Sequence, residues 1–364
     1  MSSRKLRFDR ILFAAVVGLA VFGLVMVGSA SLFSTLGSGG GEHRFLVRQA
    51  IYAVIGLALM YGLMKVDYRR YNRPWVVASF VGLTFALLVL VLFTPQINEV
   101  HRWIRLGPIH IQPSEMAKLA LALYLAYTLD KWGGQLADQP HGLLSLAGVC
   151  AALAGLVLIE PDTGTAVLLG LVTAVYLFLA SVPLKLLGAM GGASCLVLGV
   201  FIACSPYRRG RVLTMLNPDS DPLGSAYQMN QALIALGSGG LTGVGLGQSQ
   251  QKAFYLPFPF SDDIFPVIGE ELGLLGTLGV LVLFAIVFWR GCRASLRAPD
   301  SFGTYLGLAL TLTVVCQALC NLGVATALLP TKGLPLPFVS YGGSSLISML
   351  AAMGVILNIS QHSN

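Results

Sequence analysis

Charged residues are scarce in this sequence. Only 11% of its 364 residues are Asp, Glu, Lys or Arg, against about 25% in a soluble domain. Hydrophobic residues make up 55% of the chain. This composition excludes an ordinary soluble domain and indicates a protein built mainly from membrane-spanning segments.

Cysteine and histidine are also few, and neither forms a recognisable site. The six cysteines lie in or beside apolar segments, without metal-like pairing or the spacing of a secreted disulfide framework. The five histidines are scattered, so no metal site is predicted. The glycine-rich stretch 235–252 is not a dinucleotide-binding fingerprint, because no βαβ unit surrounds it. A flexible loop is the better interpretation of that stretch.

Long hydrophobic runs are what the sequence does contain. A spanning helix needs about 20 mostly apolar residues, and ten segments approach that length. The first is too long for a removable signal peptide and is expected to be a retained helix. We therefore predict an all-α polytopic membrane protein of about ten transmembrane helices, at residues 11–33, 46–65, 75–94, 114–130, 141–159, 163–181, 185–204, 266–289, 302–328 and 342–360.

The distribution of Lys and Arg predicts the orientation. With ten spans, the N-terminal side carries thirteen of these residues and the other side nine, four of which fall in the long loop 205–265. The positive-inside rule then places both termini in the cytoplasm. The net charge of +7 reflects this bias and attraction to anionic lipid, so nucleic acid is not needed to explain it. Most acidic residues fall on the outer side, where we expect the polar chemistry.

The chain is expected to form a single membrane domain over residues 1–364, with one large extracytoplasmic loop at 205–265 between spans 7 and 8. A loop of about sixty residues is usually functional or disordered. This one is rich in apolar and aromatic residues, so an interfacial or re-entrant segment fits better than disorder. No strong internal repeat is visible, which is evidence against a transporter built from two inverted halves.

Residues 101–120, HRWIRLGPIHIQPSEMAKLA, combine cations with a predicted helix start. Ser114 is a plausible N-cap, and Glu115 and Lys118 then share one helix face. One interpretation is an interfacial anchor with an intrahelical ion pair. The other is a cationic clamp for phosphate, with Arg102 beside Lys118. Ionisable groups inside a span are expensive, which favours a functional role for the pair.

Residues 257–273, PFPFSDDIFPVIGEELG, place four carboxylates at the mouth of a span. Either Asp262 or Asp263 could cap the helix that enters the membrane near Pro266. One aspartate is enough to cap the helix. Capping therefore does not explain the second aspartate, or Glu270 and Glu271. A carboxylate at the boundary between polar and apolar surroundings would have its pKa raised toward the range of a useful base.

Five blocks of the sequence resemble the SEDS family of peptidoglycan glycosyltransferases, which act in shape, elongation, division and sporulation. They occur in order across nearly the whole chain: HRWIRLGPIHIQPSEMAKLA (101–120), EPDTGT (160–165), NPDSDPLGSAYQMNQALIALGSGGLTGVGLG (217–247), QKAFYLPFPFSDDIFPVIGEELG (251–273) and LLPTKGLPLPFVSYGGSS (328–345). QKAFYLP and PTKGLPLPFVSYGG are more like the division branch than the elongation branch.

The resemblance implies polymerisation of lipid II by an inverting, one-step displacement. The catalytic Asp of the family lies in a block usually written HTDFIF, and Asp262 takes its place without gaps. Phe260, Asp263 and Pro266 depart from that pattern, which makes Asp263 a rival. The residues expected to bind substrate are Arg102, Glu115, Lys118, Lys252 and Lys332, and further candidates in the matched blocks are Asp263, Gln112, Asp162, Gln231, Ser340 and Tyr341.

The implied partners are lipid II, a class B penicillin-binding protein with transpeptidase activity, and other proteins of the division machinery. The implied location is the bacterial cytoplasmic membrane, with the active site outside. No cofactor is certain from the resemblance: a divalent cation that bridges the pyrophosphate is left open, although no cluster of ligands in the sequence demands one. The alternatives are a lipid II flippase or transporter, a scaffold that recruits a transpeptidase, and a glycosyltransferase of cell elongation.

Overall fold

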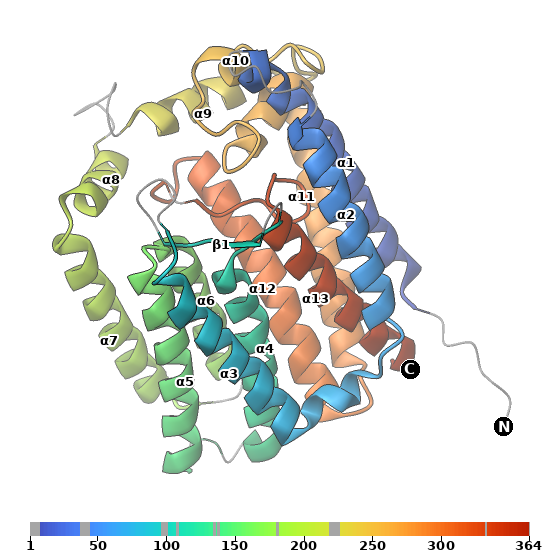
Figure 1. Cartoon of the computed structure of the whole chain (residues 1–364), viewed down its shortest axis with the longest axis vertical. Helices are drawn as coiled ribbons and strands as arrows, with labels where there is room; N and C mark the ends of the chain where they lie inside the picture. The colour runs from blue at the N-terminus through green and yellow to red at the C-terminus, as the bar shows by residue number, and fades with distance from the viewer. Residues whose placement is uncertain are drawn as a thin grey trace, which may run out of the picture.

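The computed structural model places most of the chain as one helical bundle (Figure 1). The description that follows covers residues 8–36, 44–95, 101–106, 109–133, 136, 139–179, 182–217, 226–331 and 333–363.

Ten helices of the described residues occupy the ten predicted apolar segments, which confirms the all-α polytopic architecture. Eight of them are long and apolar enough to cross a membrane. Of the other two, α6 has only 17 residues. The helix α4 carries four charged side chains, two near each of its ends: Glu115, Lys118, Asp130 and Lys131. The ten are α1 (Arg10–Leu36), α2 (Arg44–Leu63), α3 (Pro74–Val91), α4 (Pro113–Trp132), α5 (Pro140–Ile159), α6 (Thr163–Leu179), α7 (Leu184–Ala203), α11 (Ile264–Leu296), α12 (Ser301–Ala325) and α13 (Gly343–His362).

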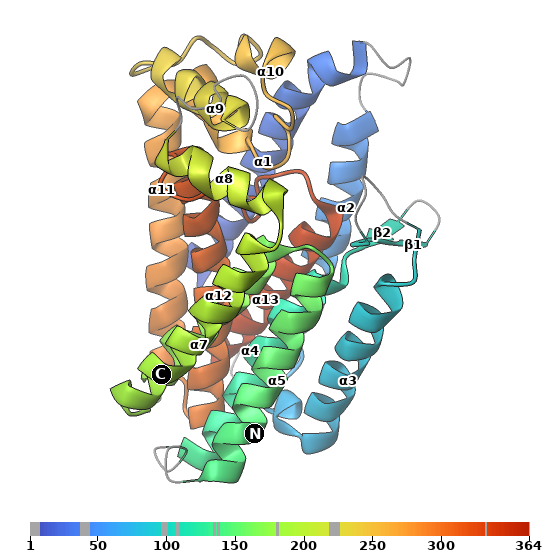
Figure 2. The same cartoon turned by 90° about the vertical axis from the view of Figure 1, so that its left-hand side faces the viewer.

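Shorter elements connect the spans. A 3-10 turn, η1 (Tyr68–Asn72), links α2 to α3, and a two-stranded hairpin, β1 (Ile104–Leu106) with β2 (Ile109–Ile111), precedes α4. The hairpin was not predicted. The large loop contains α8 (Pro206–Leu216), α9 (Tyr227–Ser238) and α10 (Gln251–Phe254), which gather at one end of the bundle (Figure 2).

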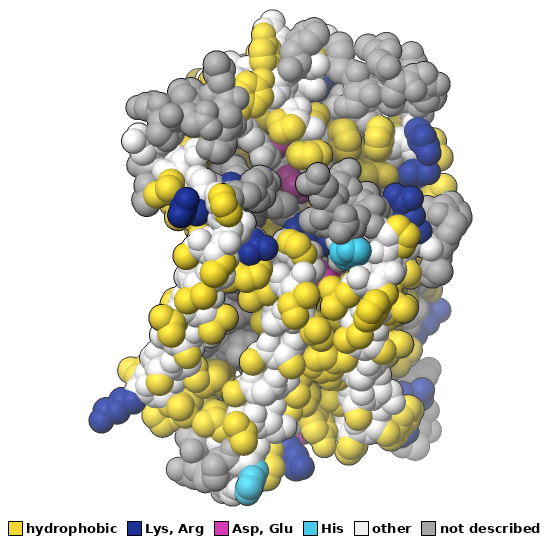
Figure 3. All heavy atoms as spheres, turned by 60° about the vertical axis from the view of Figure 1, so that its left-hand side comes forward, with side chains coloured by type: hydrophobic (Ala, Val, Ile, Leu, Met, Phe, Trp, Pro, Cys, Tyr) yellow, Lys and Arg dark blue, Asp and Glu magenta, His cyan; other side chains and the backbone are white. Residues whose placement is uncertain are grey.

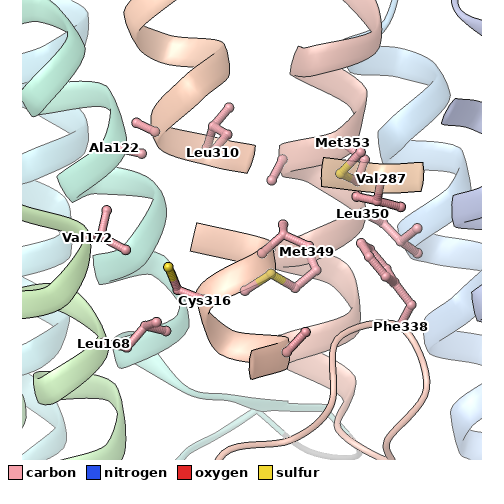
Figure 4. Close-up of a cluster of buried hydrophobic side chains, with 14 of the residues drawn as sticks. Ala122, Leu168, Val172, Val287, Leu310, Cys316, Phe338, Met349, Leu350 and Met353 are labelled. Atoms are coloured by element: carbon pink, nitrogen blue, oxygen red, sulfur yellow. The ribbon is translucent and has the colours of Figure 1, made fainter. Parts of the chain in front are cut away.

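The centre of the bundle is formed by α12 and α13. In each of them 72% of the spanning stretch is buried, whereas none of α7 is, and α7 lies along the outside in both cartoon views. Figure 4 shows Cys316 of α12 between Leu168 and Val172 of α6 on one side and Met349 of α13 on the other. The face seen in Figure 3 carries a broad hydrophobic band, with Lys and Arg side chains above and below it.

The first and last described helices, α1 and α13, meet at the end of the bundle opposite to α9, where Asp9 lies beside Ser360. The backbone N–H of Asp9 donates to Ser360 Oγ at 3.1 Å, and Arg290 forms an ion pair with the Asp9 carboxylate at 2.6 Å. An even number of spans returns the chain to its starting side, so this contact agrees with the predicted count.

The long helix α11 is interrupted at Gly273, which has φ 64° and ψ −158°. The turn formed by residues 239–245 inserts at this break. Val244 N–H donates to Glu270 O at 2.9 Å, Gly245 N–H donates to Glu271 O at 3.0 Å, and Leu274 N–H donates to Gly240 O at 2.9 Å. These bonds satisfy backbone groups that the break would leave unpaired. The predicted span at 266–289 lies within α11, but the break at Gly273 was not predicted.

Replacing Gly273 by Ala is expected to destabilise the protein by about 1–3 kcal/mol, because a side chain at positive φ is strained. An added Cβ would also lie 2.4 Å from Gly243 N. The control is Gly279→Ala on the same helix, where nothing lies within 4 Å of the added atom. That substitution should stabilise by about 0.5–1 kcal/mol. Thermal unfolding in detergent measures the stability of both variants. Equal midpoint temperatures for Gly273→Ala and Gly279→Ala would contradict the requirement for glycine at the break.

Candidate active site

Asp262 lies immediately before α11, at the junction of three segments. Its backbone carbonyl accepts a hydrogen bond from Asn321 Nδ2 of α12 at 3.0 Å, and its Oδ1 accepts one from Ser261 Oγ at 3.1 Å. A Cβ added to Gly333 would lie 3.0 Å from Asp262 Oδ2. The half-buried carboxylate therefore faces the connection between α12 and α13.

The electrostatic surroundings of Asp262 favour a base that works near neutral pH. Burial raises the pKa of this carboxyl to about 6, and the charge of Asp162 adds to the rise. The Ser261 hydrogen bond and the cations Arg102 and Arg211 act in the opposite direction. Desolvation penalises the charged form, and nearby positive charge partly restores it.

Asp263, the rival, is held by a different partner. Gln228 Nε2 of α9 lies 3.0 Å from each of its carboxylate oxygens, and only 4% of the residue is exposed. Burial raises the pKa of Asp263 to about 7. It occupies the N-cap position of α11, but its side chain makes no capping hydrogen bond, so the predicted cap is absent.

Arg102 is fixed at the corner between α5 and α6. Its Nε donates to Glu160 O at 3.2 Å, and its Nη2 donates to Pro161 O. The Glu160 side chain is fully buried, and neither of its carboxyl oxygens has a hydrogen-bond partner among the described residues. Burial raises the pKa of Glu160 to about 9, so its side chain does not neutralise the charge of Arg102 at neutral pH.

Asp162 ties α4 to α6 beside this corner. It accepts hydrogen bonds from Gln112 Nε2 at 3.2 Å, Ser114 Oγ at 3.1 Å and Thr165 Oγ1 at 2.9 Å. Ser114 is therefore not the N-cap that the sequence predicted. Gln112 holds that position, with Pro113 in the first turn, and Ser114 uses its hydroxyl to reach Asp162.

Arg211 of α8 was not predicted as a site residue. Its Nη1 donates to Thr331 O at 3.0 Å, and its charge acts on Asp262. The signal in the sequence was the run Arg208, Arg209 and Arg211, which counted only toward orientation. Sequence alone could not show which of these arginines turns inward.

The predicted ion pair between Glu115 and Lys118 is present inside the bundle. Lys118 Nζ lies 2.7 Å from Glu115 Oε2, with both side chains almost fully buried. Lys118 also donates to Gln317 Oε1 at 2.6 Å, and Ser348 Oγ donates to Glu115 Oε2 at 2.8 Å. The pair thus joins α4, α12 and α13.

This pair lies deeper than Asp262. Gln317, which contacts Lys118, and Asn321, which contacts the Asp262 backbone, are four residues apart on α12. That spacing is about one helical turn, or roughly 6 Å along the axis. The site therefore has an outer carboxylate and an inner ion pair arranged along one helix.

The remaining predicted residues are only partly brought together. Lys252 is buried in an ion pair with Glu271 and contacts Ser29 of α1. Tyr341 N–H donates to Phe260 O at 2.8 Å, two residues before Asp262, and Ser340 Oγ accepts from Leu336 N–H at 2.7 Å. Gln231 is half-buried on α9, and Lys332 lies outside the described residues.

A groove of about 610 Å³ runs along the bundle past Gln112 and Glu115, and neither Asp262 nor Arg102 lines it. It is bounded by α2, α3, α4, α12 and α13, and its walls are largely apolar. Gln112, Glu115 and Ser344 line its outer end, whereas Tyr71 and Val76 line it near the opposite end. Within the described residues, no group of three or more His, Cys, Asp and Glu side chains could hold a metal ion.

Comparison with known proteins assigns the family. The family model FTSW_RODA_SPOVE, described as "Cell cycle protein", matches residues 9–364. A probable peptidoglycan glycosyltransferase FtsW from Geobacter metallireducens is 40% identical over 358 residues, covering 97% of this chain and 95% of that protein. Stage V sporulation protein E from Bacillus subtilis is 38% identical over 370 residues, with complete coverage of both.

Solved structures agree with this assignment. A chain described under "Structural coordination of polymerization and crosslinking by a peptidoglycan synthase complex" aligns with a TM-score of 0.77 and 30% identity, covering 97% of each chain. The rod shape determining protein RodA from Thermus thermophilus aligns with a TM-score of 0.70 and 28% identity, over 98% of this chain and 97% of that one. With a matching family model, close full-length relatives and the same helical architecture, this chain belongs to the FtsW/RodA/SpoVE, or SEDS, family of membrane proteins.

Proposed function

We propose that this protein is a peptidoglycan glycosyltransferase that polymerises lipid II at the outer face of the bacterial cytoplasmic membrane, for septal synthesis in cell division. The observation that carries the proposal is the Asp262 carboxylate, which has a pKa of about 6 and lies in the field of Arg102 and Arg211. The relatives named probable peptidoglycan glycosyltransferase FtsW support the same activity.

The arrangement fits a one-step displacement with inversion. Asp262 accepts the proton of the attacking sugar hydroxyl as its oxygen bonds to the anomeric carbon of the growing strand. The bond from that carbon to the lipid pyrophosphate breaks, and the electron pair leaves with the pyrophosphate. Arg102 and Arg211 stabilise the charge that develops there. General-base catalysis of this kind contributes typically about 10²–10⁴-fold.

The groove is suited to bind the polyprenyl tail of the lipid substrate. A polyprenyl chain is apolar throughout, and the groove is apolar from Leu119 to Val76. Its polar outer end contains Gln112, which contacts Asp162, and the charge of Asp162 reaches Asp262. A lipid tail in the groove would therefore bring its pyrophosphate toward the proposed base.

A lipid II flippase is the second candidate, favoured by the ion pair Glu115–Lys118 inside the bundle. Lipid II supplied in detergent micelles has no leaflet to cross, so it separates the two functions. The purified protein should convert labelled lipid II into glycan strands under these conditions. Complete absence of polymer, with flipping in vesicles, would overturn the glycosyltransferase proposal.

The partner we propose is a class B penicillin-binding protein, because new glycan must be crosslinked where it is made. The structural relative from a peptidoglycan synthase complex supports a joint assembly. Adding the cognate transpeptidase to the micelle assay, and scoring glycan length, tests the partnership. Complementation of division-defective and elongation-defective strains distinguishes septal from lateral synthesis.

The rate should rise with pH through about 6, because Asp262 accepts a proton only when ionised and its pKa is about 6. Arg211→Met removes a cation that lowers the pKa of Asp262. The acid limb of the pH–rate profile of this variant should therefore move to higher pH. Arg209→Met, which changes the exposed neighbour on the same helix, should leave the midpoint in place. Initial rates measured between acidic and neutral pH give the midpoint of the acid limb for the wild type and both variants. The same midpoint in the wild type and in Arg211→Met would contradict the role of Arg211.

A further inference from the structure

Three buried side chains from distant parts of the sequence form a closed cluster at the break in α11. Lys252 Nζ of α10 lies 2.5 Å from Glu271 Oε1, and Ser29 Oγ of α1 donates to Glu271 Oε1 and Oε2 at 2.8 and 2.7 Å. Lys252 Nζ also donates to Ser29 Oγ at 2.9 Å. We call Ser29, Lys252 and Glu271 the clasp.

The clasp is continuous with a second set of bonds on the preceding residue. Glu270 accepts hydrogen bonds from Ser249 Oγ and from Gln250 N–H, the latter at 2.9 Å. Two successive carboxylates therefore bind the segment 249–252 from the outer part of α11. The backbone carbonyls of the same two glutamates accept bonds from the turn 239–245. Glu270 and Glu271 therefore hold the N-terminal side of the break through both side chain and backbone, while Leu274 N–H bonds to Gly240 O on its other side.

The position of the clasp excludes direct contact with substrate in this state. The side chains of Lys252 and Glu271 are both 0% exposed. Burying an ion pair costs desolvation energy that an apolar pair would avoid, so fold stability alone is a poor explanation for it. Such pairs are better suited to fixing one arrangement among several.

The arrangement that the clasp fixes includes Asp262. The outer part of α11 runs from Ile264 to Gly273, with Asp262 at its start and Glu271 beside the break. Nine helical residues form a rigid arm of about 13 Å. A rotation of roughly 5° at the break would move the far end by about 1 Å, and a displacement of that size can cost about 100-fold in rate.

We propose that the clasp holds the outer arm of α11 in register and thereby positions the Asp262 carboxylate for proton transfer. Lys252 and Glu271 are positioning residues in this scheme, and Lys252 does not grip the pyrophosphate. The inference rests on the proposed function of Asp262. The ion pair between Lys252 and Glu271 takes no chemical step of its own in this scheme, so its effect on the rate must pass through the geometry of the arm.

The test compares Lys252→Met and Glu271→Gln with the double variant, using initial rates on lipid II. Each single variant leaves one buried charge unpaired, and we expect kcat to fall about 100-fold with KM changed less than about twofold. The double variant removes both charges and should recover at least about tenfold over Lys252→Met. If Lys252 instead binds pyrophosphate, KM rises in Lys252→Met and the double variant is no better, which overturns the proposal.

Hydrogen–deuterium exchange provides a readout that does not depend on activity. Exchange in residues 239–262 should increase in each single variant and return toward the wild-type rate in the double variant. Unchanged exchange in Lys252→Met would overturn the clasp even if activity fell. A wild-type protein without polymerase activity would overturn the proposed function, while exchange would still test the clasp.

The matched control is the ion pair between Asp9 and Arg290 at the opposite end of the bundle. Asp9→Asn should lower thermal stability without a change in kcat per folded molecule or in exchange over 239–262. A loss of kcat in this control equal to that of Lys252→Met would show a general effect of lost ion pairs and contradict positioning.

Discussion

Asp262→Asn should lower glycan synthesis by at least about 100-fold, because an amide cannot accept the proton of the sugar hydroxyl. The substitution keeps the size of the side chain, and Ser261 Oγ and the Asn321 bond to the backbone carbonyl can remain. The fold and the binding of lipid II should therefore be preserved. Polymer formed from labelled lipid II in micelles, normalised to folded protein, measures the effect.

Asp263→Asn is the matched control, because it makes the same replacement of a carboxylate by an amide at the adjacent residue. Asp263 is only 4% exposed and both of its oxygens contact Gln228 Nε2, so a substrate hydroxyl has little access to it in this arrangement. We expect less than about a tenfold loss, caused by a weaker contact with α9. If Asp263→Asn is inactive and Asp262→Asn is not, the two roles are reversed.

Lys118→Met should destabilise the protein by about 3–5 kcal/mol, the largest effect on stability that we expect from one substitution. It removes the cation 2.7 Å from Glu115 and leaves that carboxylate buried among α4, α12 and α13. The double variant Lys118→Met/Glu115→Gln removes the stranded charge and should recover much of the loss. Thermal unfolding in detergent measures each variant.

Lys131→Met serves as the control for that comparison, since Lys131 is an exposed lysine at the other end of the same helix. It should change stability by no more than about 0.5 kcal/mol. A similar midpoint for Lys118→Met and Lys131→Met would mean that the inner pair is solvated, contrary to the buried position described above. A double variant no more stable than Lys118→Met would argue that the cost lies in packing.

The helices were predictable because each is a long apolar run, and the length of a span depends only on local composition. The pair Glu115–Lys118 was predictable for a similar reason, since residues three apart share a helix face. The break at Gly273 was not, because it is stabilised by backbone bonds to a turn some thirty residues earlier. Its glycine is one of 42 in the chain and carries no local signal of a break.

The site was predicted in part. Asp262 and Arg102 follow from residue type and from the resemblance, and the charge of Arg102 does act on Asp262. The roles of Gln228 and Arg211 depend on where α8 and α9 fold back over the bundle, which sequence spacing does not determine. Lys252 was expected beside the pyrophosphate because it is a cation on the outer side. Its pairing with Glu271 requires two segments to meet, and neither segment reveals the other.

The break in α11 has a consequence for biogenesis. The backbone groups that complete it belong to residues 239–245, on the same side as Asp262. In the proposed orientation, with Asp262 at the outer face, the helix can acquire its bent shape only after that turn has crossed the membrane and folded back. Insertion of the helices into the bilayer can therefore precede completion of the proposed active site, which would form only after this segment has been translocated.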